Sequence, residues 1–138
     1  MTAQFHLDQD VDKRLKEHLN VHYGDDEVAK TAAELGLHRS LDGHHLLAAA
    51  QAGRILVTHN GKDFITMQDA WVRWSGAWGV TPMHAGILII SQAWVPLVAA
   101  REISQFLGTR ASLPNEIYAY DADPNVQRWV RNPVPKRR

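Results

Sequence analysis

Cysteine is absent from the chain, which excludes disulfide bonds, thiolate metal sites and a cysteine nucleophile. Long apolar runs are absent as well. The longest, residues 85–90, has the length of a strand and not of a membrane-spanning helix. The first residues lack the charged and then apolar pattern of a signal peptide. We therefore expect a cytoplasmic protein that does not insert into a membrane.

Net charge is a third absence, because 15 basic side chains balance 15 acidic ones. A dedicated nucleic-acid binder is usually basic, so any contact with nucleic acid must be local. One basic patch lies near the C-terminus and comprises Arg128, Arg131, Lys136, Arg137 and Arg138. It is explained either as a solvated tail or as a contact surface for RNA.

The 138 residues are enough for one domain with a sizeable core. No internal repeat, linker or low-complexity segment interrupts them, so we expect a single domain over residues 1–138. Apolar periodicity predicts strands that alternate with helices. The strands are expected at residues 4–7, 27–31, 54–58 and 85–91. The helices are expected from about residue 11 to Gly24 and at 42–52, 68–78 and 96–107.

Two further strands, at residues 116–120 and 126–130, flank a turn-rich stretch and predict a closing hairpin. Strands that alternate with helices of 10 to 13 residues predict an α/β fold with a mostly parallel sheet covered on both faces. In such a sheet, ligands bind at the carboxyl ends of the strands.

Aspartates stand at those ends. Asp8 directly follows the first expected strand, Asp63 lies in the loop after the third, and Asp42 opens the second helix. Carboxylates brought together at one sheet edge repel each other unless a cation lies between them. Mg²⁺ and similar hard ions prefer oxygen ligands of this kind, and a water held on such an ion becomes a nucleophile.

Each carboxylate also has a structural explanation. Asp42 is placed to cap the second helix, together with Ser40, and Asp10 is placed to cap the first. Asp63 is placed to close an Asx turn beside Asn60. The carboxylate site and these structural roles both remain open at the level of the sequence.

Four stretches carry a resemblance to a known family through their order and spacing. They are residues 5–10 (FHLDQD), 33–42 (AELG followed by SLD), 53–64 (GRILVTHNGKDF) and 84–87 (HAGI). They resemble the bacterial PIN-like domains of unknown function that are related to VapC-type toxin ribonucleases. The resemblance covers about residues 4–108, which leaves the hairpin and basic tail in residues 109–138.

This resemblance implies a three-layer α/β/α fold and an acidic metal pocket. It implies that Asp8 is the first acidic position, Asp42 the helix-borne one and Asp63 the loop one. Two residues depart from the family pattern: Gln9 stands where relatives often have Glu, and Asn60 stands where some have Asp.

The predicted function is therefore a nuclease that hydrolyses RNA with Mg²⁺ or Mn²⁺ held by these three catalytic carboxylates. Asp10 is a possible further ligand, and Asn60 and His59 are expected to orient the substrate. A cognate antitoxin is a possible partner. The alternative is a catalytically weak PIN-like fold that serves as a binding or regulatory module.

Histidine and tryptophan raise two further hypotheses. His44 and His45 on the second helix, with His59, could hold a transition metal, but adjacent helical residues point about 100° apart and do not share an ion. His84 is expected to have a structural role or to support a neighbouring residue.

Trp71, Trp74 and Trp78 form one stripe on the third helix. The stripe is explained as core, as a homodimer face reached by Trp78, or as a surface on which RNA bases stack.

Overall fold

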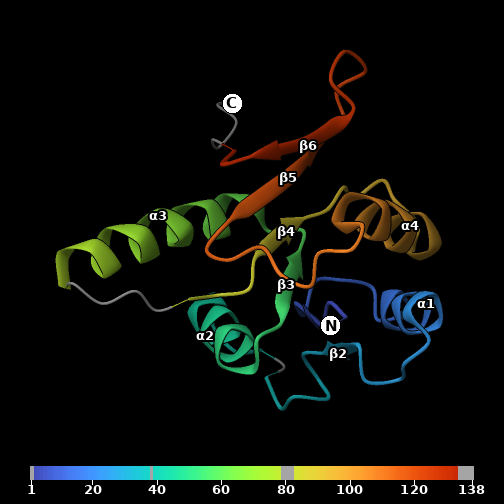
Figure 1. Ribbon diagram of the computed structural model, residues 1–138, viewed down its shortest axis with the longest axis horizontal. Coiled ribbons are helices and arrows are strands. Elements are labelled where there is room, and N and C mark those ends of the chain that lie inside the picture. The colour runs from blue at the N-terminus through green and yellow to red at the C-terminus, as the bar shows by residue number, and fades with distance from the viewer. Residues whose placement is uncertain (1, 38, 79–82, 134–138) are drawn as a thin grey trace.

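The computed structural model describes residues 2–37, 39–78 and 83–133 (Figure 1). Its elements in chain order are β1 (Phe5–Leu7), α1 (Arg14–Tyr23), β2 (Ala29–Thr31), α2 (Asp42–Ala52), β3 (Ile55–Thr58), α3 (Gly61–Trp78), β4 (Ile87–Ile89), α4 (Pro96–Leu107), β5 (Ile117–Asp121) and β6 (Arg128–Arg131). Within these residues, six strands form one sheet in the order β2-β1-β3-β4-β5-β6. All neighbouring pairs are parallel except the antiparallel β5–β6 pair. The predicted α/β class, mostly parallel sheet and closing hairpin are confirmed.

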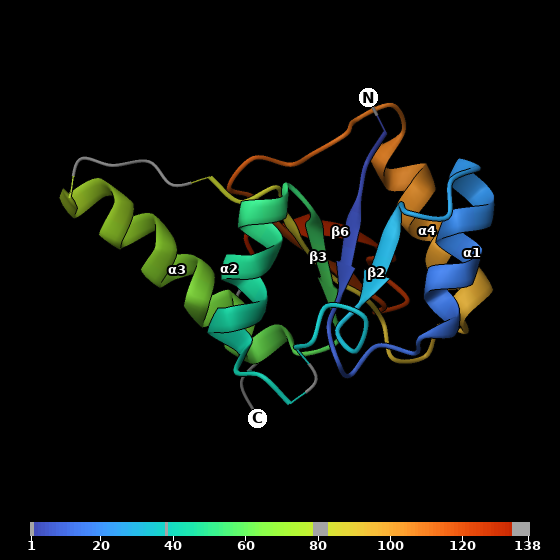
Figure 2. The ribbon, with the colours of Figure 1, turned by 90° about the horizontal axis from the view of Figure 1, so that it is seen from below.

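Helices cover both faces of this sheet. Figure 2 shows α1 and α4 side by side on one face, with α2 and α3 on the other. The central strands β1, β3 and β4 are buried throughout. Because successive side chains of a strand point to opposite faces of the sheet, each of these strands contributes to the core on both faces. Phe5 and Leu7 join the core beneath α1 and α4, while Leu56 joins a smaller core with Leu46 and Phe64. No helix among the described residues is long and apolar enough to cross a membrane.

The third helix is longer than the sequence predicts. It begins at Gly61 and not at residue 68, so the expected loop through Asp63 is wrong. Phe64 and Gln68 are buried four residues apart, which gives the first turns of α3 an inner face against the sheet. Asn60 and Gly61 are typical turn residues, so the sequence predicts a loop where the helix begins.

The inner face of α2 includes a histidine. His45 is fully buried beside Leu46 and Ala49, whereas Leu47 is 49% exposed. The buried face of the helix therefore places an imidazole ring against the sheet.

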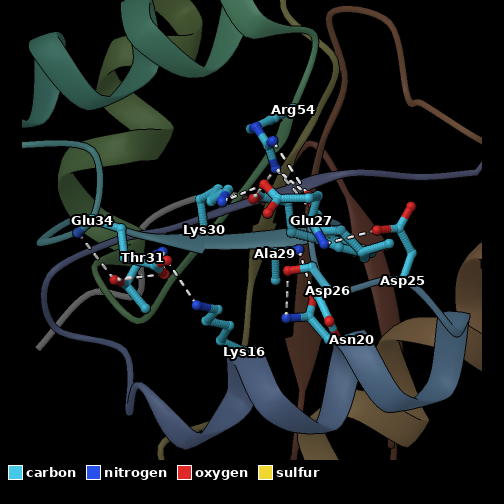
Figure 3. Close-up of polar contacts among 12 residues, drawn as sticks. Lys16, Asn20, Asp25, Asp26, Glu27, Ala29, Lys30, Thr31, Glu34 and Arg54 are labelled. Atoms are coloured by element: carbon cyan, nitrogen blue, oxygen red, sulfur yellow. Dashed lines mark hydrogen bonds and ion pairs between the residues drawn. The ribbon is translucent and has the colours of Figure 1, made fainter.

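Side chains add to the backbone pairing that joins the edge strand β2 to β1 (Figure 3). The Asn20 side chain accepts a hydrogen bond from the Ala29 backbone N–H (2.9 Å) and donates one to the Asp26 carbonyl (3.1 Å). The Arg54 guanidinium donates to the carbonyls of Phe5 and Val28 (3.2 and 3.1 Å). These bonds support the pairing of β2 with β1, which makes β1 an interior strand between β2 and β3.

Candidate functional site

The candidate site lies at the carboxyl edge of β1 and β3, which are parallel neighbours. Asp8 follows β1 directly, is 3% exposed, and donates its backbone N–H to the carbonyl of Val57 (2.9 Å). The Asp8 side chain is therefore fixed at the point where sequence analysis placed the first acidic residue.

Thr58, the last residue of β3, joins Asp8 to the following loop. Its hydroxyl donates to Asp8 Oδ2 (2.8 Å) and accepts the backbone N–H of Asn60 (2.9 Å). The other oxygen, Asp8 Oδ1, accepts the backbone N–H of Gln9 (2.8 Å). Both carboxylate oxygens therefore have a defined donor, which is typical of a charged group that is held in one orientation.

Asp42 and Asp63 meet at Asn60. The Asn60 Nδ2 lies 3.0 Å from Asp42 Oδ2 and 3.0 Å from Asp63 Oδ2, so one amide group bridges the two carboxylates. Asp42 is the first residue of α2, and Asp63 lies in the first turn of α3. Through Asn60 and Thr58, hydrogen bonds connect all three predicted carboxylates.

The alternative capping roles are not observed. The N-cap residues are Lys13 for α1 and Leu41 for α2, and neither helix has a side-chain cap hydrogen bond. Asp10 Oδ1 instead accepts the backbone N–H of His59 (3.4 Å), which places it beside the site. Asp63 accepts from the Asn60 amide rather than closing an Asx turn.

Electrostatic repulsion accumulates in this cluster. Burial, and then the neighbouring charge of Asp8, raises the pKa of Asp10. Burial, and then Asp8 and Asp63, raises the pKa of Asp42. Like charges held close together disfavour the ionised state, so a proton or a cation would relieve the cluster.

His59 and Asn60 were expected to orient the substrate, and the structure gives each an internal contact. His59 Nδ1 lies 3.2 Å from the carbonyl of Ile90. Since a carbonyl only accepts, Nδ1 carries the proton. The Asn60 amide nitrogen is engaged by Asp42 and Asp63, so Asn60 organises the carboxylates. Substrate orientation by either residue stays a prediction.

Two buried histidines lie beneath Asp8, and sequence reasoning missed their role. His6 Nε2 lies 2.9 Å from His45 Nδ1, and His45 Nε2 lies 3.6 Å from Asp8 Oδ1. The signal for His45 was its position beside Leu46 on the inner face of α2. His44 is exposed, so the two adjacent histidines do point apart.

Within the described residues, no group of three histidine, aspartate or glutamate side chains stands ready to hold a metal ion. The predicted ligands are nevertheless hard oxygen donors, the type that Mg²⁺ and Mn²⁺ prefer. The side chain of Gln9 accepts the backbone N–H of Arg39 (2.6 Å). It fixes the loop before α2 and supplies no carboxylate.

The remaining predicted residues lie away from these contacts. His84 is buried, contacts Gln68 Oε1 through Nε2 (2.6 Å) and accepts the Gly86 N–H through Nδ1 (3.0 Å), which is a structural role. Trp71 packs partly buried against the smaller core, whereas Trp74 is 65% exposed.

Two predictions fall partly outside the described residues. The Trp78 side chain is not among them, and neither are Lys136, Arg137 and Arg138. Arg128 and Arg131 are exposed, and Arg131 pairs with Glu116 (2.8 Å). The structure thus describes two of the five residues of the basic patch.

Comparison of the chain with protein-family models, with curated proteins and with solved structures finds no match in any of the three. What the protein does is therefore inferred from its own side chains.

Proposed function

We propose that this protein is a metal-dependent nuclease of the PIN-like class that hydrolyses RNA phosphodiester bonds, with its helix-covered sheet as a PIN-like three-layer α/β/α fold. The observation that carries the proposal is the acidic cluster itself. Asp42 and Asp63 share one Asn60 amide, and Thr58 links that loop to Asp8. An arrangement with this much like charge is costly for the fold alone, and such sites are typically functional.

The residues of the cluster fit a hard divalent cation. Asp8, Asp42 and Asp63 would hold Mg²⁺ or Mn²⁺, with Asp10 as a further ligand. The Asn60 amide group already donates to the carboxylates of Asp42 and Asp63. A cation would also be stabilised between these two carboxylates. When bound, the ion supplies an activated water and neutralises charge on the phosphoryl group.

The chain's own groups supply orientation. Thr58 holds Asp8 through its hydroxyl, and the Asn60 amide holds the other two carboxylates in register. His59 is anchored through Nδ1 to Ile90, so Nε2 would act as a base in the neutral ring and would donate to a phosphate oxygen or to the leaving oxygen only in the doubly protonated ring.

The test measures Mn²⁺ binding and RNA cleavage separately. Wild-type protein is titrated with Mn²⁺ by electron paramagnetic resonance, and a panel of single-stranded RNAs is incubated with Mg²⁺, with Mn²⁺ or with a chelator. Asp8→Asn should abolish metal-dependent cleavage while the protein stays folded. Asp12→Asn is the matched control, because Asp12 is an exposed aspartate paired with Arg14, and it should cleave like wild type.

The second candidate is a binding or regulatory module that has lost catalysis. Two observations favour it: the described residues contain no preassembled three-residue ligand set, and Gln9 is neutral and occupied by Arg39. Wild-type protein that neither binds Mn²⁺ nor cleaves any RNA of the panel would refute the nuclease and favour this module. Pairing with an antitoxin applies to either candidate, and an adjacent gene for a small DNA-binding protein would support it.

A further inference from the structure

A continuous row of polar side chains, His6, His45 and Asp8, runs from the core to the candidate site. His6 is the middle residue of β1 and is 1% exposed, and His45 on α2 is 0% exposed. Their rings meet edge to face with centroids 5.2 Å apart. His6 Nε2 lies 2.9 Å from His45 Nδ1, and His45 Nε2 faces Asp8 Oδ1 at 3.6 Å. Two histidines buried between β1 and α2 require an explanation, because buried polar groups need partners.

The contact between the rings restricts where the protons lie. A contact between two imidazole nitrogens needs one N–H and one bare nitrogen. If the His45 proton were on Nδ1, the bare Nε2 would face a carboxylate oxygen, which places two acceptors against each other. His6 would then carry its own proton on Nδ1, an atom that is buried without a partner among the described residues. An N–H left unsatisfied in this way is costly.

The opposite arrangement removes both conflicts. With its proton on Nε2, His6 donates to His45 Nδ1, and His45 then carries its proton on Nε2, toward Asp8. The His6 N–H now has an acceptor at 2.9 Å. The His45 Nε2–H faces Asp8 Oδ1 at 3.6 Å, without a hydrogen bond among the described residues, and the His6 Nδ1 lone pair is unused.

We propose that His45 is a positioning residue for Asp8, with its Nε2–H directed at Asp8 Oδ1 and its tautomer fixed by His6. At 3.6 Å the contact is longer than a hydrogen bond. It acts as an electrostatic attraction, which is strengthened by burial. Together with Thr58 on Oδ2 and the Gln9 N–H on Oδ1, it fixes the plane of the carboxylate. The consequence for metal binding rests on the proposed function, whereas the proton arrangement does not.

The proton arrangement is tested without metal, by ¹⁵N nuclear magnetic resonance of the imidazole nitrogens in the full chain at pH 7. Both His6 and His45 should carry a proton on Nε2 and none on Nδ1. His6→Leu should leave His45 as a mixture of tautomers, and His6→Gln, which restores a donor, should return it to Nε2–H. Wild-type His45 found as the Nδ1–H tautomer, or doubly protonated, would overturn the proposal.

The positioning role is tested by Mn²⁺ affinity. Partners that orient metal-binding carboxylates are typically worth about 10–100-fold in affinity, so His45→Leu should weaken Mn²⁺ binding by about that factor. His45→Gln keeps an N–H donor and should stay near wild type. His44→Leu, on the exposed neighbour, is the matched control and should also bind like wild type.

Thermal unfolding of the same variants separates positioning from packing. A purely structural role would lower stability in both His45 variants and leave the Mn²⁺ affinity of the folded protein unchanged, which would overturn the positioning role. If wild-type protein binds no Mn²⁺, the proposed function and the positioning for metal both fail. The nitrogen spectra then decide the proton arrangement alone.

Discussion

Replacement of Thr58 by valine is the sharpest test of how the acidic cluster is held. Valine keeps the shape of the side chain but removes the hydroxyl that donates to Asp8 Oδ2 (2.8 Å) and accepts from Asn60 (2.9 Å). A hydrogen bond to a charged group contributes about 1.5–3 kcal/mol, and a buried group left without its partner costs about 1–3 kcal/mol. Asp8 is almost fully buried, whereas Asn60 is only half-buried, so most of the cost arises at Asp8. We expect Thr58→Val to lower the free energy of unfolding by about 2–4 kcal/mol.

Urea unfolding followed by circular dichroism measures this loss. With a typical m value of about 1.5–2 kcal/mol/M, the midpoint should fall by about 1–2.7 M. Thr66→Val is the matched control, because the Thr66 hydroxyl donates to the Lys62 carbonyl on the exposed side of α3. That variant should stay within about 0.5 kcal/mol of wild type. A Thr58→Val protein as stable as Thr66→Val would show that Thr58 does not hold Asp8.

Three other predictions concern different parts of the chain. Because folding raises the pKa of Asp42 above its ordinary value of 3.8, the folded state binds more protons than the unfolded chain. The contribution of Asp42 to stability should therefore be fully present below that value and be lost as pH rises through the folded pKa. Asp42→Asn should remove this part of the pH dependence in urea titrations between about pH 4 and 7, and an unchanged slope would contradict it. Trp74 is exposed, so it is available for the homodimer face predicted for the tryptophan stripe. Light scattering should give twice 15.5 kDa for wild type and 15.5 kDa for Trp74→Ala. A mass of 15.5 kDa for wild type at every concentration would exclude a dimer. Gly86 has φ +124°, and a Cβ at this position would lie 2.8 Å from Leu113 Cβ. Gly86→Ala should therefore lower the free energy of unfolding by at least about 2 kcal/mol, measured by thermal unfolding. Gly43 has open space around it, so Gly43→Ala should not destabilise the fold.

Local pattern was sufficient to predict most of the architecture. Alternating strands and helices, the parallel sheet and the hairpin all follow from periodicity and turn residues over short windows, and the structure has them in the expected order. The error at the start of α3 has a local cause too. Asn60 and Gly61 are strong turn formers and therefore predict a loop. The inner face of the first turns of α3 consists of Phe64 and Gln68, and two residues give too weak a helical pattern to change that prediction.

The candidate site was predictable only in part. The positions of Asp8 and Asp42 at strand and helix ends follow from the sheet topology. The contact between His6 and His45 joins residues 39 apart in the chain, and no window of sequence contains both. Thr58 reads as an ordinary β-branched strand residue, and its bond to Asp8 crosses 50 residues. Side-chain partners across a sheet depend on register, which sequence periodicity does not specify.

The interior position of β1 has a consequence for how the site is lost. β1 has three residues, all buried, and pairs with β2 on one side and β3 on the other, while the Asp8 amide bonds to Val57. Backbone amides of this kind exchange with solvent only through the largest opening reactions of a protein, and not through local fraying. Asp8 should therefore keep its place through every partial opening of the molecule. Heat or denaturant should then disperse the carboxylates in the same cooperative step that unfolds the domain.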